Sequence, residues 1–143
     1  MKYLLSAAMV MSLLGCAGTP VAGGLSDQKL ADCASKPNCV CSDMAISDSH
    51  YIEPLAVQSV DDWNWLADDL AAQSNTEVVS RSENYLHLTF TTPLIRYTDD
   101  VELHFVATKK HIAVRSASRI GYSDLGANKK RVEMIREKLK QKI

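Results

Sequence analysis

The stretch YLHLTFTTPLIRYTDDVELHFVATKKHIAVRS, residues 85–116, decides the fold of this chain. It supplies three of four short runs that are rich in β-forming residues and are separated by turn-like residues: 77–82, 85–91, 101–107 and 111–116. Short joins between consecutive strands favour antiparallel pairing. The sequence therefore predicts a four-stranded antiparallel meander.

Apolar and polar residues alternate along these runs, as they do in strands with one buried face. The apolar positions are expected to form the core face: Leu86, Leu88, Phe90, Val101, Leu103, Phe105, Ile112 and Val114. The intervening positions are expected to form the opposite face: Tyr85, His87, Thr89, Glu102, His104, Ala113 and Arg115. This second set is polar enough to predict a face in contact with solvent.

One amphipathic helix is predicted before the strands and one after them. The first spans Ser59 to about Gln73, and the second spans Ala127 to about Lys142. Apolar residues recur in both at helical spacing: Trp63, Leu66, Ala67, Leu70 and Ala71, then Val132, Ile135 and Leu139. With both helices on one face of the meander, the predicted fold class is α+β.

The N-terminal stretch MKYLLSAAMVMSLLGC, residues 1–16, has a lysine and then an uncharged apolar run that is short for a bilayer span. Its ending, Leu-Leu-Gly-Cys at 13–16, resembles the bacterial lipoprotein signal. This resemblance implies a signal peptide over 1–15 and acylation of Cys16, for example with palmitate. A plain secretory signal with an incidental cysteine is the alternative. Ala17 stands where an aspartate would favour the inner membrane, so we expect the outer membrane, with the protein facing the periplasm.

The next residues predict a tether and then one domain. Residues 17–26 hold three glycines and a proline without an apolar period, which indicates a lipidated flexible tether over 16–31. Residues 32–143 then form a single domain, and 143 − 15 = 128 residues is an ordinary domain size. The formal net charge of −1 gives no field that attracts nucleic acid. The expected partner is the membrane, through the lipid, and no nucleic acid.

Beyond the lipidated cysteine, three cysteines remain, so an oxidising compartment predicts one disulfide and one free thiol. A Cys33–Cys39 bridge is the first choice because proline and asparagine form a turn between them. A Cys33–Cys41 bridge is the second choice, and a Cys39–Cys41 bridge is the least favoured. A zinc site of these cysteines with His50 is a further alternative, but it lacks paired C-x₂-C spacing. We expect no metal and no cofactor.

Two segments together resemble the DUF1499 family: CASKPNCVCS at 33–42, and DDVELHF at 99–105 followed by VRSASRIGYSDLGANKKRVE at 114–133. The matching positions are Pro37, Asn38, Cys39, Asp99, Asp100, Arg115, Ser116, Ser118, Arg119, Gly121, Ser123, Asp124, Gly126, Asn128 and Arg131. The resemblance covers about 33–139 and implies a small exported or lipid-anchored domain without an established activity. Cys41 stands where the family usually has serine.

Six residues in and after the last of these segments are candidate ligand-binding residues: Arg115, Arg119, Ser123, Asp124, Asn128 and Arg131. They lie near the predicted start of the second helix, where free N–H groups and the helix dipole favour an anion such as phosphate or carboxylate. The alternative is architectural. In that case Ser123 and Asp124 cap the helix, and Asp99 and Asp100 pair with the arginines.

A hydrolase-type enzyme is the third interpretation of the same region. Ser118 or Ser123 would be the nucleophile, and His104 or His111 would be its base. The chain has no G-x-S-x-G, H-E-x-x-H or Walker motif. We therefore assign no catalytic residue and expect a binding or envelope-interaction module rather than an enzyme.

Overall fold

The computed structural model describes residues 18–142, so the predicted signal peptide and Cys16 lie outside the described residues. Two α-helices are present, α1 at Val60–Ala71 and α2 at Ala127–Lys142. A short 3-10 helix, η1, spans Ala107–Lys109. The strands are β1 Leu25–Ser26, β2 Lys29–Leu30, β3 Cys39–Cys41, β4 Leu55–Ala56, β5 Thr76–Arg81, β6 Tyr85–Thr91, β7 Thr98–Val106 and β8 His111–Ser118.

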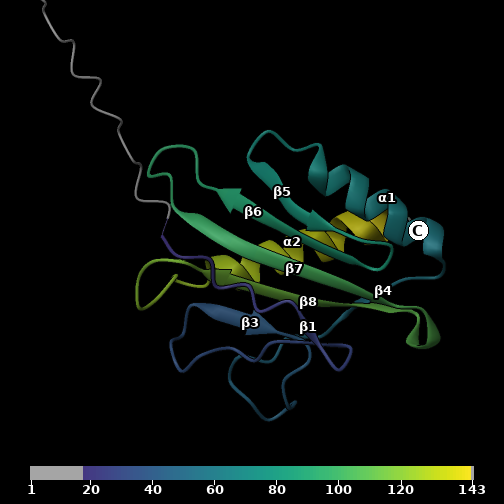
Figure 1. Cartoon of the computed structure of the whole chain (residues 1–143), viewed down its shortest axis with the longest axis horizontal. Coiled ribbons are helices and arrows are strands. Elements are labelled where there is room, and N and C mark those ends of the chain that lie inside the picture. The colour runs from purple at the N-terminus through teal and green to yellow at the C-terminus, as the bar shows by residue number, and fades with distance from the viewer. Residues whose placement is uncertain (1–17, 143) are drawn as a thin grey trace, which may run out of the picture.

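The main sheet contains the predicted meander but is larger than predicted. Strands β5, β6, β7 and β8 pair in sequence order, and all of these pairings are antiparallel. Strands β3 and β4 both pair with β8, which gives six strands with the order β3-β8-β7-β6-β5 and β4 beside β8. The prediction of four strands is therefore wrong. Because short strands precede it, α1 lies within the strand order and not ahead of it (Figure 1).

The predicted core face is packed against the helices. Leu86, Leu88 and Leu103 belong to one buried cluster with residues of both helices, among them Trp63 of α1 and Val132 of α2. The Trp63 ring stacks on Phe105 with 6.0 Å between ring centroids, and its Nε1 donates to the Glu83 carbonyl. The apolar residues that recur at helical spacing in α1 and α2 thus pack against the apolar residues that alternate along the strands, and together they form one buried layer.

The opposite face of the sheet is here called the outer face. The prediction that this face contacts solvent is wrong. Asp100 and Glu102 are fully buried there, and His87, His104 and Arg115 are nearly so. The N-terminal segment covers these residues, and Figure 1 shows this segment crossing β7 and β8 on the side away from α2. Polar character alone misled the prediction, because a covered face can also be polar when its groups are paired.

The covering segment comprises residues 18–31, most of the predicted tether. Within it, β1 and β2 form a small antiparallel hairpin. Leu30 is buried with Cys41 and Ala113 in a second apolar cluster. These residues therefore pack as a layer of the fold. Neither helix of the described chain is long and apolar enough to cross a membrane.

Candidate functional site

The centre of the outer face is the carboxylate of Asp100, which has no exposure to solvent. Arg119 binds it in a bidentate manner, with Nε to Oδ2 at 2.9 Å and Nη2 to Oδ1 at 2.8 Å. His87 Nε2 lies 2.8 Å from Oδ1, and the backbone N–H of Val21 donates to Oδ2 at 2.9 Å. Burial alone would raise the pKa of Asp100, but the hydrogen bonds from His87, Arg119 and Val21 hold it well below its usual range.

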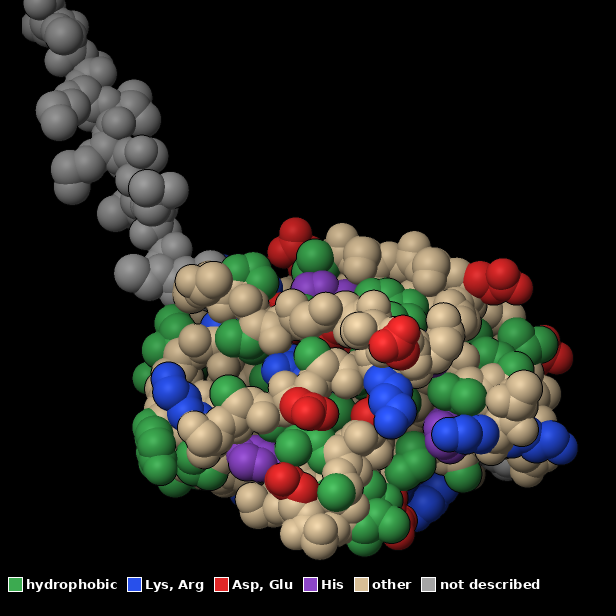
Figure 2. All heavy atoms as spheres, turned by 60° about the horizontal axis from the view of Figure 1, so that its bottom comes forward, with side chains coloured by type: hydrophobic (Ala, Val, Ile, Leu, Met, Phe, Trp, Pro, Cys, Tyr) green, Lys and Arg blue, Asp and Glu red, His purple; other side chains and the backbone are tan. Residues whose placement is uncertain are grey.

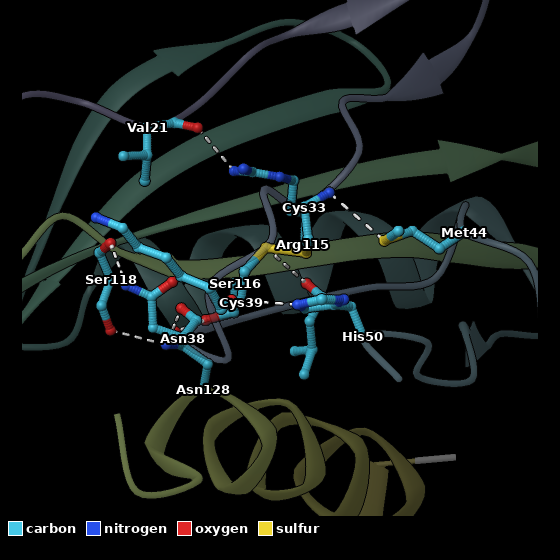
Figure 3. Close-up of a disulfide and its surroundings, with 12 residues drawn as sticks. Val21, Cys33, Asn38, Cys39, Met44, His50, Arg115, Ser116, Ser118 and Asn128 are labelled. Atoms are coloured by element: carbon cyan, nitrogen blue, oxygen red, sulfur yellow. Dashed lines mark hydrogen bonds between the residues drawn. A yellow bond between two sulfur atoms is a disulfide. The ribbon is translucent and has the colours of Figure 1, made fainter. Parts of the chain in front are cut away.

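Glu102 forms the second half of this outer network. Its Oε1 accepts from the Tyr85 hydroxyl at 2.8 Å and from the Gly24 N–H at 2.8 Å, while Oε2 accepts from Arg115 Nη1 at 3.2 Å. The same Arg115 Nη1 donates to the Val21 carbonyl at 2.9 Å (Figure 3). Val21 is thus held through both of its peptide groups. Two buried carboxylates and two arginines fasten the N-terminal segment to the sheet; we call this arrangement the clamp.

A separate inner network lies on the helix face of the sheet, at the N-terminal end of α2. Arg131 Nη2 donates to Asp99 Oδ2, and its Nη1 donates to Ser116 Oγ at 2.9 Å and to Asn128 Oδ1 at 2.6 Å. Asn128 Nδ2 reaches the Asn38 carbonyl at 3.0 Å. Arg131 also lies over the Phe90 ring, 5.1 Å from its centroid. This network therefore joins α2 to β7, β8 and the residue directly before β3.

The start of α2 is occupied by the protein's own carboxylate. Asp124 accepts from the N–H groups of Gly126 at 2.8 Å and Asn128 at 2.9 Å, and Ser123 Oγ accepts from the Leu125 N–H at 3.3 Å. Burial works against ionisation of Asp124, but the N–H groups of Asn128 and Gly126 lower its pKa below the ordinary value. A carboxylate already fills the place where the sequence predicted an anion.

The six candidate ligand-binding residues do not meet in one site. Arg115 and Arg119 lie in the outer network, whereas Asn128 and Arg131 lie in the inner network on the other side of the sheet. The expected pairing of Asp100 with Arg119 is present, while Asp99 pairs with Arg131 and Arg115 pairs with Glu102. Each arginine is thus neutralised by a carboxylate of the sheet.

The serines and histidines of the hydrolase interpretation are far apart. His111 and Ser118 stand at the two ends of β8, which places them about 23 Å apart at the usual strand rise. His104 pairs with Ala113, toward the His111 end of the same sheet. Ser118 Oγ accepts from Asn128, and Ser123 Oγ accepts from the Leu125 N–H. The described residues therefore bring no such serine to such a histidine.

The disulfide is Cys33–Cys39, as the first choice predicted, with 5.7 Å between the two Cα atoms. Figure 3 shows it on the outer side of the sheet near Arg115. Cys41 is a free and fully buried thiol, and burial raises its pKa to about 11. With two of three sulfurs in a bridge, the zinc alternative loses its ligands. Residues 18–142 contain no group of three or more His, Cys, Asp or Glu side chains arranged to hold a metal ion.

A hollow of about 630 Å³ lies at the other end of β7 from Asp100. His104, His111, Asp43 and Lys29 are among its lining residues. His104 is 2% exposed, and its Nδ1 has no hydrogen-bond partner among the described residues. Burial lowers the pKa of both histidines, so neutral imidazoles are favoured at this hollow.

This burial predicts a pH dependence of stability. The unfolded chain takes up a proton at His104 near pH 6.5, whereas the folded chain does so only at lower pH, so the free energy of unfolding should fall between about pH 7 and 5. A His104→Phe variant should show a smaller fall, with the remainder due to His111. Urea unfolding followed by tryptophan fluorescence at both pH values measures this, and an unchanged slope in the variant would contradict it.

Sequence reasoning missed the residues that matter most to the outer network. Alternation predicts a solvent-facing side for Glu102, Tyr85 and His87, and the composition of residues 17–26 predicts a flexible tether at Val21. One signal was present in the sequence, since Asp100 and Glu102 stand at alternate positions of β7 and Glu102 lies directly opposite Arg115 of β8.

Residues 29–139 match a family model whose description reads protein of unknown function, DUF1499. No curated protein and no solved structure matches the chain.

Proposed function

Since the chain belongs to the DUF1499 family, whose description assigns no activity, we propose its role from the clamp. The protein is an outer-membrane lipoprotein that carries its lipid on Cys16 and faces the periplasm. Its domain acts as an envelope-interaction module and not as an enzyme. The observation that carries this proposal is the hold on Val21, only five residues after the cysteine.

The clamp suits an anchored protein because it holds the sheet at a short distance from the residue that would carry the lipid. Both peptide groups of Val21 are bound, one by Asp100 and one by Arg115. A tether of five residues reaches at most roughly 18 Å, so an acylated Cys16 keeps the sheet close to the bilayer. The arginines of the family signature support this arrangement, because carboxylates of the fold take their charge and leave less for an anionic ligand.

The far end of the sheet is the part that an envelope partner can reach. The hollow at His104 and His111 lies there, at the opposite end of β7 from Asp100. Its lining combines carboxylate, ammonium and imidazole groups with the apolar side chain of Phe105. Such a mixture is typical of binding sites, which join apolar walls to a few polar groups.

Replacing Cys16 with serine tests the anchor. The Cys16→Ser variant should move from the outer-membrane fraction to the soluble periplasmic fraction, and it should no longer incorporate labelled palmitate, because the acylated thiol is gone. Fractionation and fatty-acid labelling in cells measure the two effects. Cys41→Ser is the matched control and should still fractionate with the membrane. A Cys16→Ser protein that remains in the outer membrane would defeat the proposal.

A further inference from the structure

Two loops meet at the end of the sheet where the described chain begins. One loop, residues 92–97, joins β6 to β7, and the other, residues 119–126, joins β8 to α2. Thr91 pairs with Thr98, and Asp99 pairs with Ser118, so both loops leave the sheet at the same ends of neighbouring strands. Figure 1 shows both loops at the end where the coloured chain starts.

These loops expose an unusual share of apolar surface. Of the eleven large exposed hydrophobic side chains in the part of the chain described, six lie in the two loops: Leu94, Ile95, Tyr97, Ile120, Tyr122 and Leu125. Leu94 is 95% exposed and Leu125 is 89% exposed. A hollow of about 220 Å³ between the loops is lined by Tyr97, Ile120 and Leu125, so the two sets form one patch. Figure 2 shows hydrophobic side chains gathered at this end.

The start of the described chain touches this patch. A Cβ atom built on Gly18 would lie 2.9 Å from Arg119 Cβ and 3.0 Å from Ile120 Cγ1. Gly18 also has a positive φ of 68°, so glycine suits this close approach. The residue two places before it is Cys16. Two residues span at most roughly 7 Å, so a lipid on Cys16 would enter the bilayer close to Gly18 and Ile120.

We propose that the loops 92–97 and 119–126 form a membrane-resting surface that inserts into the interface of the bilayer holding the lipid anchor. This inference rests on the proposed acylation of Cys16. Leucine and isoleucine at the loop tips enter the acyl boundary, and Tyr97 and Tyr122 lie at the headgroup level that tyrosine favours. Arg96, Lys129 and Lys130 are exposed on or next to the loops and are placed to meet anionic headgroups.

A bilayer is a better occupant than a protein partner for this patch. Soluble domains rarely expose contiguous apolar patches without a partner. The chain arrives here at its anchor, so a bilayer beside the patch follows from the anchor alone, whereas a protein would have to fit between the domain and its own lipid. The hollow at His104 then points to the opposite end, away from the lipid.

Quenching by brominated lipids tests the surface. Full-length protein from membranes is reconstituted in vesicles of phosphatidylethanolamine and phosphatidylglycerol with brominated phosphatidylcholine, as Tyr97→Trp and as Thr108→Trp. Thr108 is exposed in η1 at the other end of the sheet and is the matched control. After subtraction of the signal from Trp63 and Trp65 in the parent protein, the tryptophan at position 97 should be quenched at least about threefold more than that at 108.

The outcomes separate this proposal from the proposed function when labelled palmitate on Cys16 is measured in the same samples. Labelled protein with strong quenching at 97 supports both. Labelled protein with equal quenching at the two positions overturns the membrane-resting surface, assigns the loops to a protein partner and leaves the anchor intact. Absence of label on Cys16 overturns both proposals.

Discussion

Replacing Arg119 with alanine should lower the free energy of unfolding by about 3–5 kcal/mol, because it leaves the buried carboxylate of Asp100 without its bidentate partner. Asp100 has no contact with solvent, and Arg119 supplies two of its hydrogen bonds. Urea unfolding at pH 7 measures the loss. The pKa of folded Asp100 lies below its unfolded value, so its contribution is present above about pH 4 and is lost only in stronger acid.

A surface arginine provides the control for this experiment. Arg81 pairs with Asp68 at 2.8 Å, but the two side chains are 38% and 70% exposed, so Arg81→Ala should cost less than about 1 kcal/mol. Hydrogen exchange adds a local readout, since the Val21 amide should lose protection in Arg119→Ala and keep it in Arg81→Ala. Equal stability of the two variants would show that the outer network does not carry the fold.

Arg131→Ala should produce a loss of the same order, about 3–5 kcal/mol, on the helix face of the sheet. Asp99 is 4% exposed and would remain as an unpaired carboxylate, Ser116 Oγ would lose the N–H donor from which it accepts, and Asn128 Oδ1 would keep only the Ser116 hydroxyl as its donor. Leaving buried polar atoms without partners adds to the cost. Thermal and urea unfolding of the variant measure the effect.

Two further variants show whether geometry or charge matters at this position. Arg131→Lys keeps the positive charge but has one ammonium nitrogen in place of the two guanidinium nitrogens that bind Asp99 and Asn128. The Arg131→Lys variant should therefore lose less stability than Arg131→Ala but should not reach the stability of the parent protein. Lys140→Ala, in the exposed last turn of the same helix, should change stability by less than about 1 kcal/mol. Full recovery by lysine would indicate that only the charge of Arg131 is needed.

The sequence predicted the meander well because its signals are periodic. Residues 85–91 and 127–142 begin and end as predicted, and alternation placed the core residues of β6, β7 and β8 on the helix face. Strands β3 and β4 were missed for a physical reason. They have three and two residues, which is too short for any period, and they are formed by pairing with β8.

The site was harder to predict than the fold. A polar strand face usually indicates solvent, and nothing in the glycine-containing segment before it has the pattern of a covering layer. The sequence indicates the arginines as candidate site residues, but their partners lie on two different faces, since neighbouring Asp99 and Asp100 point to opposite sides of β7. Strand register brings Arg115 to Glu102, whereas the path of the chain after β8 and the packing of α2 decide the partners of Arg119 and Arg131.

The clamp also bears on how this segment can change over evolutionary time. It holds Val21 and Gly24 through peptide groups, so a substitution at residue 21 by anything except proline keeps the N–H that Asp100 requires. The side chain at residue 21 can therefore vary while the docking persists, whereas Gly24, with a positive φ of 68°, is restricted by its backbone. The family model compares residue types, so its match can begin at residue 29, although the chain already packs against the sheet from residue 18.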